Sequence, residues 1–234
     1  MTDYQGPQQR LRIEFALGEQ LKYISHLDLA RAWERAFRRA GLPLAYSQGF
    51  NPRPRFQIAA ALPVGVSGRA ELLDVWLDEV LDPAAVLRRL RPILPAGLRV
   101  LAASEVELRQ ASLQSQMRTA EYRATVASHE PAEAIRARIE ALMAAPALLR
   151  QRHHKGRLQT YDLRPLVLGI EVVDGGDGPA SDGPTGDTAA HVLEMRLQAS
   201  PQGAGRPDEV LDTLGLSLMP RRIERTKLHF EFDK

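Results

Sequence analysis

The segment that most constrains the fold is residues 23–56, where signals for a helix start, a helix end and a loop follow one another directly. Ser25 followed by Asp28 approximates a capping box, and the aspartate suits the positive end of a helix dipole. Gly41 can adopt the left-handed conformation after a last helical turn, and Pro43 prevents continuation. We therefore predict a helix between these signals. Its core-facing stripe is Leu29, Trp33, Ala36, Phe37 and Ala40.

Arginines occupy another face of this predicted helix. Arg31, Arg35 and Arg38 follow at helical spacing, with Arg39 beside them. Residues 31–55 contain six arginines and one acid, a net charge of +5 in a chain whose total is +2. A solvated helix surface is the simplest interpretation. The arginine face contains no lysine, and arginine suits bidentate pairing with phosphate or carboxylate. Binding of a polyanion to this face is therefore an equal alternative.

Two further segments extend this hypothesis. The loop at residues 47–55 combines an aromatic ring with amide and guanidinium groups, the side chains that stack on bases and bind phosphates. Residues 150–157 form a basic run, and Tyr161 follows it; this segment is either a solvated loop or a second phosphate-binding segment. The candidate RNA-binding residues are Arg31, Arg35, Arg38, Arg39, Phe50, Asn51, Arg53, Arg55, Arg152, Lys155, Arg157 and Arg164.

Through several short sequence motifs the chain resembles a known family, the bacterial radical SAM-linked proteins. The matching residues are Ile24–Asp28 (ISHLD), Arg38–Ala40, Leu42–Pro43, Tyr46–Ser47, Gly49–Pro52 (GFNP), Leu62–Pro63 with Gly65 and, more weakly, Asp162–Pro165. The similarity extends over about residues 9–232. It implies a companion of a radical SAM enzyme that acts on RNA, with a structured RNA such as tRNA as partner. It supplies no catalytic residues.

Composition excludes several kinds of site. The 234 residues include no cysteine, which rules out disulfides, thiolate metal sites and an iron–sulfur cluster held by this chain. Any radical chemistry must therefore come from a partner that carries the cluster. We expect no cofactor and no metal in this chain. Adjacent His153 and His154 cannot face the same side of an extended segment, so we do not predict a metal site from them. No apolar run reaches membrane-spanning length, and no signal peptide is evident, so we expect a cytoplasmic protein.

Hydrophobic periodicity predicts an α+β fold of two tandem ferredoxin-like (β-α-β-β-α-β) units, with antiparallel sheets and helices on one face. The expected domains are residues 1–110, which carry the SHLD and GFNP words, and residues 111–234, with an acidic flexible loop at 174–188. The predicted strands are 11–17, 56–62, 71–77, 98–106, 121–127, one within 156–173, 191–199 and 221–232. The predicted helices are 26–40, 83–91, 131–144 and 208–214.

Three functions remain compatible with these patterns. We favour a non-catalytic RNA-binding partner of a radical SAM enzyme. The first alternative is a metal-independent endoribonuclease, in which His26 at the helix start would act as general base, although a structural role is commoner for such a histidine. The second is a subunit that contacts only protein. Asp74 and Asp78 are possible acids or metal ligands, but a solvated sheet face is the simpler interpretation. Trp33 and Trp76 are expected in the core.

Overall fold

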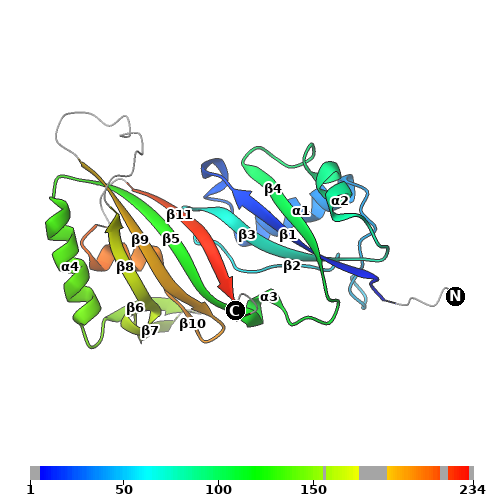
Figure 1. Ribbon diagram of the computed structural model, residues 1–234. Coiled ribbons are helices and arrows are strands. Elements are labelled where there is room, and N and C mark those ends of the chain that lie inside the picture. Colours follow the sequence, from blue (N-terminus) through cyan, green and yellow to red (C-terminus); the bar gives the residue numbers. More distant parts are fainter. Residues whose placement is uncertain (1–5, 155–156, 174–188, 217–220, 232–234) are drawn as a thin grey trace. The chain divides into compact units, whose positions relative to one another are not determined.

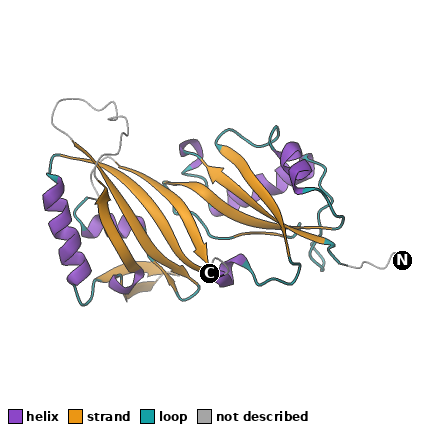
Figure 2. Ribbon diagram, viewed as in Figure 1, coloured by secondary structure: helices purple, strands orange, loops and turns teal. Residues whose placement is uncertain are grey.

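The computed structural model describes residues 6–154, 157–173, 189–216 and 221–231. The chain divides into two compact units, residues 1–117 with 230–234 and residues 118–229 (Figure 1). Both units combine antiparallel strands with helices, which confirms the predicted α+β class (Figure 2). Among the residues described, no helix is both long enough and apolar enough to cross a membrane.

The first unit has a four-stranded antiparallel sheet in the order β2-β3-β1-β4. Alternation of apolar residues in β1 places one set of side chains against the helices and the other set on the opposite face. Two α-helices and a short 3₁₀ helix, η1, connect these strands. The elements are β1 (Gln9–Leu17), η1 (Glu19–Leu21), α1 (His26–Arg39), β2 (Phe56–Ile58), β3 (Val66–Leu77), α2 (Pro83–Leu90) and β4 (Leu98–Val106).

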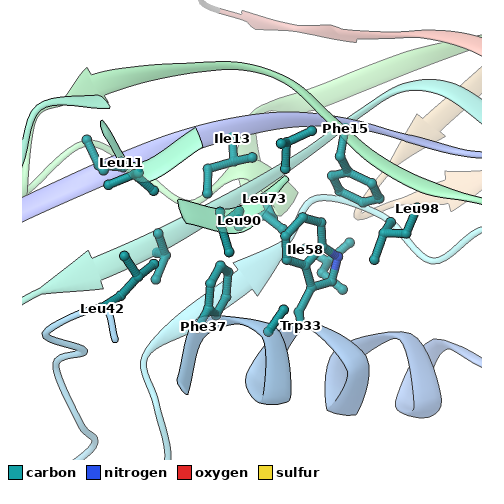
Figure 3. Close-up of a cluster of buried hydrophobic side chains, with 14 of the residues drawn as sticks. Leu11, Ile13, Phe15, Trp33, Phe37, Leu42, Ile58, Leu73, Leu90 and Leu98 are labelled. Atoms are coloured by element: carbon teal, nitrogen blue, oxygen red, sulfur yellow. The ribbon is translucent and has the colours of Figure 1, made fainter. Parts of the chain in front are cut away.

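The core of this unit lies between the sheet and the two helices (Figure 3). The ring of Trp33 in α1 is fully buried, with its centroid 5.1 Å from that of Phe15 and 5.3 Å from that of Phe37. Val86 and Leu90 of α2 belong to the same cluster. Both helices therefore pack on one face of the sheet, and Trp33 is a core residue as expected.

The predicted helix caps of the first unit are present. The Ser25 hydroxyl accepts a hydrogen bond from the Asp28 amide at 3.1 Å, so α1 begins where the sequence predicts. The Asp82 carboxylate accepts from the amides of Ala84 and Ala85 at the start of α2. These side chains satisfy amides that have no partner within the helix.

Part of the other face of this sheet is covered by the segment at residues 107–116, which includes α3 (Leu113–Gln116). Arg10 on β1 donates hydrogen bonds to the carbonyl oxygens of Gln110 and Ala111, and Leu113 is fully buried. Asp74 is also fully buried here, bonded to Arg10 and Arg12. The interpretation of Asp74 as a residue on a solvated face was therefore wrong, because a covering segment remote in sequence shields it.

The second unit has its strands in the order β8-β9-β5-β11, and the pairs β8/β9 and β5/β9 are antiparallel. The short β10 extends the β9 edge. Strands β6 and β7 form a separate two-stranded hairpin. The elements are β5 (Met117–Ser128), α4 (Ala132–Ala144), β6 (Leu149–His154), β7 (Arg157–Asp162), η2 (Arg164–Leu166), β8 (Val167–Val173), β9 (Ala189–Ser200), β10 (Gly203–Ala204), α5 (Pro207–Thr213) and β11 (Arg221–Phe230).

Three predicted strands differ from the structure. Strand β2 has three residues instead of the seven predicted for 56–62, β3 begins at Val66 instead of residue 71, and the segment at 156–173 contains two strands, β7 and β8. The hairpin escaped prediction because its strands are short and rich in charged and polar residues, so they show no apolar alternation. The predicted acidic loop at 174–188 lies outside the described residues.

Candidate nucleic-acid interface

The arginines of α1 fall into two classes. Arg31 pairs with Asp28 at 3.1 Å, and Arg38 pairs with Glu34 at 2.8 Å. Arg35 and Arg39 are also exposed, and neither has a carboxylate within salt-bridge distance among the described residues. Only these two guanidinium groups of the row are therefore available for a ligand without breaking an ion pair.

Arg35 and Arg39 border a shallow depression of about 200 Å³ within the first unit. Ala32 and Ala36 form its α1 wall, and the opposite side comes from the chain after α2. Because alanine side chains are small, the surface of α1 is recessed at this point. A group that enters the depression meets two guanidinium groups on one rim.

Helix α2 adds arginines that the sequence analysis did not select. Arg88, Arg89 and Arg91 are exposed, and Asp82 is the only acid between residues 82 and 91. Arg88 lies 3.6 Å from the Asp82 carboxylate. The signal was available in the sequence as three arginines within four residues. Because α1 and α2 cover the same face of the sheet, their arginines share one layer.

The loop that follows α1 has a closed neck and an exposed tip. The Ser47 amide donates to the Arg53 carbonyl at 2.9 Å, and the Arg53 amide donates to the Ser47 hydroxyl at 3.0 Å. Gly49 has a φ of 137°, a conformation that favours glycine. Phe50 is fully exposed, and Asn51 and Arg53 of the same loop are also exposed.

Arg55 lies apart from the arginines of α1. Its guanidinium group is 5.0 Å from the centroid of the Trp76 ring, and that of Arg10 is 4.7 Å from the same ring. Trp76 alternates in β3 with core residues, so Arg55 lies on the sheet face opposite the helices. Trp76 is only half-buried, which corrects its expected place in the core. Arg55 thus cannot belong to one surface with the α1 row.

The SHLD motif and the GFNP motif lie at opposite ends of β3. The Gly65 amide donates to the Lys22 carbonyl at 2.7 Å, which joins the start of α1 to the beginning of β3. The GFNP loop instead adjoins the end of β3, where the Ala45 amide bonds to the Trp76 carbonyl. The two motifs are close in sequence, but in the structure the twelve-residue strand β3 separates them.

His26 is the first residue of α1 and is exposed. Hydrogen bonds from the Ser25 hydroxyl and then from Arg31 lower the pKa of Asp28 below its ordinary value. The Asp28 carboxylate is therefore already engaged by its helix cap and by an arginine. Among the described residues, no hydrogen bond or ion pair joins the Asp28 carboxylate to His26.

The basic segment of the second unit is a hairpin anchored to α5. Strands β6 and β7 pair from Leu149 opposite Asp162 to His154 opposite Arg157. The Tyr161 hydroxyl donates to Glu209, and burial together with this carboxylate raises the pKa of Tyr161.

Arg152 of this hairpin is exposed, with its guanidinium group 4.8 Å from the centroid of the Tyr161 ring. Lys155 and the side chain of Arg157 lie outside the part of the chain that the structure describes.

Arg164 has a different position from the other candidates. Its guanidinium group donates to the Met143 carbonyl at 2.7 and 3.1 Å and to the Val167 carbonyl at 2.9 Å. The Asp162 carboxylate accepts from the Leu148 and Arg164 amides. Arg164 therefore joins the end of α4 to the start of β8, and these bonds use three of its five N–H donors.

No group of three histidine, cysteine, aspartate or glutamate side chains within the described residues is placed to hold a metal. The second unit has a depression of about 360 Å³ on its sheet, bordered by Glu121, Glu171, Glu194 and Arg196. Two of its carboxylates are paired, Glu194 with Arg123 at 2.5 Å and Glu121 with His229 at 2.8 Å. Its acidic rim does not suit a polyanion.

Comparisons with known proteins give a family but no activity. No curated protein matches the chain. Among solved structures, a Cbf5–Nop10–Gar1 complex is 14% identical with a TM-score of 0.48, covering 97% of this chain and 54% of that chain. An archaeal box H/ACA sRNP Nop10–Cbf5 complex is 13% identical with a TM-score of 0.44, covering 95% and 48%. The chain thus spans about half the length of these chains. A family model described as "Uncharacterized protein conserved in bacteria (DUF2344)" matches residues 10–207, and the chain belongs to this family.

Proposed function

We propose that this protein binds structured RNA, such as tRNA, and acts as a non-catalytic partner of a radical SAM enzyme in RNA modification. The observation that carries the RNA-binding part is the pair Arg35 and Arg39, which are exposed, have no carboxylate within salt-bridge distance among the described residues and border a depression. Planar guanidinium groups in this state suit bidentate phosphate contacts.

The layer of α1 and α2 carries exposed arginines from both helices. Residues 107–116 cover part of the opposite sheet face and accept hydrogen bonds from Arg10. Arg55 remains on that opposite face, where it stacks on Trp76. We therefore assign the phosphate contacts to Arg35 and Arg39, with the exposed arginines of α2 adding to the local positive potential.

We also propose that the chain consists of two ferredoxin-like domains, residues 1–110 and 111–234. The strand orders β2-β3-β1-β4 and β8-β9-β5-β11 support this, because the four strands occupy equivalent places in both units. In each unit a helix follows the first strand and another precedes the last. Repetition of the fold gives no function by itself.

The enzyme partner is proposed from two sequence properties. The chain resembles radical SAM-linked proteins in its SHLD and GFNP words, and it has no cysteine to hold an iron–sulfur cluster. In this proposal the partner supplies the cluster and the chemistry, and this chain supplies RNA affinity.

The test is equilibrium binding of tRNA by the full chain across a series of salt concentrations. The double variant Arg35→Gln/Arg39→Gln should weaken binding, and the slope of log affinity against log salt should fall by about 1.4 to 1.8 if each arginine contacts one phosphate. Arg99→Gln is the control for the loss of one positive charge, because Arg99 is an exposed arginine of β4 between two buried residues that face the core. Equal losses per charge removed in the two variants would refute the assignment.

The same RNA distinguishes the alternatives. Incubation of labelled tRNA with the protein in excess chelator should leave it intact. Cleavage that His26→Ala abolishes would instead establish a metal-independent endoribonuclease. If no RNA binds at physiological salt and the arginine variants lose a co-purifying enzyme, the chain is a protein-facing subunit.

A further inference from the structure

The most exposed large apolar side chain in the described residues belongs to Phe50 at the tip of the loop after α1. Its relative exposure is 106%, whereas Phe15, Phe37 and Phe230 are buried. A phenyl ring held wholly in water contributes nothing to the core, so its apolar surface is available for a ligand.

The loop that carries this ring is held in shape before any ligand arrives. In addition to the two Ser47–Arg53 hydrogen bonds, Tyr46 and Pro54 form an isolated β-bridge. Below the bridge, the Arg55 amide donates to the Ala45 carbonyl at 2.7 Å. A ring on such a closed neck can bind at a smaller cost in conformational entropy than a ring on an open loop.

The surroundings of the ring favour a nucleic-acid base over an apolar protein pocket. Residues 47–55 contain no acid and two arginines. Asn51 and Arg53 of the same loop are exposed and offer hydrogen-bond donors for a phosphate or a base edge. Gly49 adds no side chain next to the ring. A positively charged loop with one exposed aromatic ring is the combination that stacks unpaired bases.

The loop also lies at the end of the unit where α1 ends. Leu44 forms a β-bridge with Leu77, and the Asp78 amide donates to the Pro43 carbonyl at 2.8 Å. Arg39 occupies the last turn of α1. A single RNA molecule therefore has phosphate contacts and an exposed ring available on the same unit.

We infer that Phe50 is a stacking platform for an unpaired base, with Arg53 and Asn51 contacting the same nucleotide, so that the RNA bound carries a single-stranded nucleotide at this loop. This inference rests on the proposed function and deepens it, because it specifies the kind of RNA. A continuous duplex has its bases stacked internally and cannot offer one to the ring.

The experiment uses the full chain with two probes, a blunt RNA duplex and the same duplex with a single-stranded overhang containing 2-aminopurine. Phe50→Leu removes the ring and keeps an apolar side chain, while Phe50→Trp keeps an aromatic platform. The leucine variant should bind the overhang RNA about 5- to 160-fold more weakly and lose the 2-aminopurine quenching, and the tryptophan variant should retain both the affinity and the quenching. Affinity for the blunt duplex should not change in either variant.

Failure of this inference is separable from failure of the proposed function. If Phe50→Leu binds both RNAs as the unsubstituted chain does while Arg35→Gln/Arg39→Gln weakens both, stacking is refuted and RNA binding stands. Loss of a co-purifying protein in Phe50→Leu with unchanged RNA affinity would assign the ring to a protein partner and refute stacking. Absence of binding to either RNA would refute both proposals. Circular dichroism checks that each variant is folded, as expected for an exposed site.

Discussion

Replacement of Asp74 by alanine should destabilise the first unit more than any change to its surface ion pairs. The fully buried carboxylate accepts four hydrogen bonds, two from Arg10 at 2.5 and 3.0 Å and two from Arg12 at 2.9 and 3.1 Å. The Arg10 side chain is 1% exposed and that of Arg12 is 10% exposed. Without Asp74 these guanidinium groups keep their desolvation cost and lose their counter-charge.

Loss of one partner from a buried ion pair costs about 3–5 kcal/mol. A unit of about 117 residues has an unfolding entropy near 0.25 kcal/mol per kelvin, so this loss corresponds to a fall in Tm of about 12–20 °C. Tryptophan fluorescence during urea or thermal unfolding is the selective assay. The two tryptophans of the chain, Trp33 and Trp76, both belong to the first unit.

Glu34→Gln is the control for this measurement. It removes a carboxylate that pairs with Arg38 at 2.8 Å, but both side chains are partly exposed, at 33% and 56%. Pairs of this kind contribute about 0–1 kcal/mol. A destabilisation below 1 kcal/mol in Asp74→Ala, or one equal to that of the control, would refute the claim that buried charge compensation holds this face together.

Three further outcomes are expected. Trp33→Ala should lower the free energy of unfolding by about 3–5 kcal/mol, since the ring is fully buried among aromatic neighbours; denaturant titration measures this. Carbon-detected NMR should find the pKa of Asp28 below its ordinary value, and Ser25→Ala should raise it, because the hydroxyl bond favours the carboxylate. The stabilisation tied to this shift should be complete above the unfolded-state pKa and disappear as pH falls through the lower folded-state pKa. Arg164→Gln should destabilise the second unit through its lost bonds to Met143 and Val167 without weakening tRNA binding, which parallel unfolding and binding titrations test.

Local signals in the sequence located most elements of the fold. Ser25 and Asp82 cap helices where predicted, because a cap requires only a side chain within two or three residues of the amide it bonds. The β4 bounds of 98–106 agree with prediction because the segment lies between turn residues. The hairpin of β6 and β7 was missed because its strands are stabilised by pairing with each other and by contacts to α5, which no local pattern records.

The candidate site was predictable as a set of residue types but not as a surface. Sequence alone determined that arginines gather along one helix, that no thiolate ligand exists and that an aromatic ring interrupts a basic loop. Only the tertiary structure decided which cations are free: Arg35 and Arg39 remain unpaired among the described residues, Arg55 stacks on the opposite face, and Arg164 bonds to backbone carbonyls. The physical reason is distance along the chain, because the partners that occupy a guanidinium group can lie 21 residues away, as for Arg164, or 64, as for Arg10.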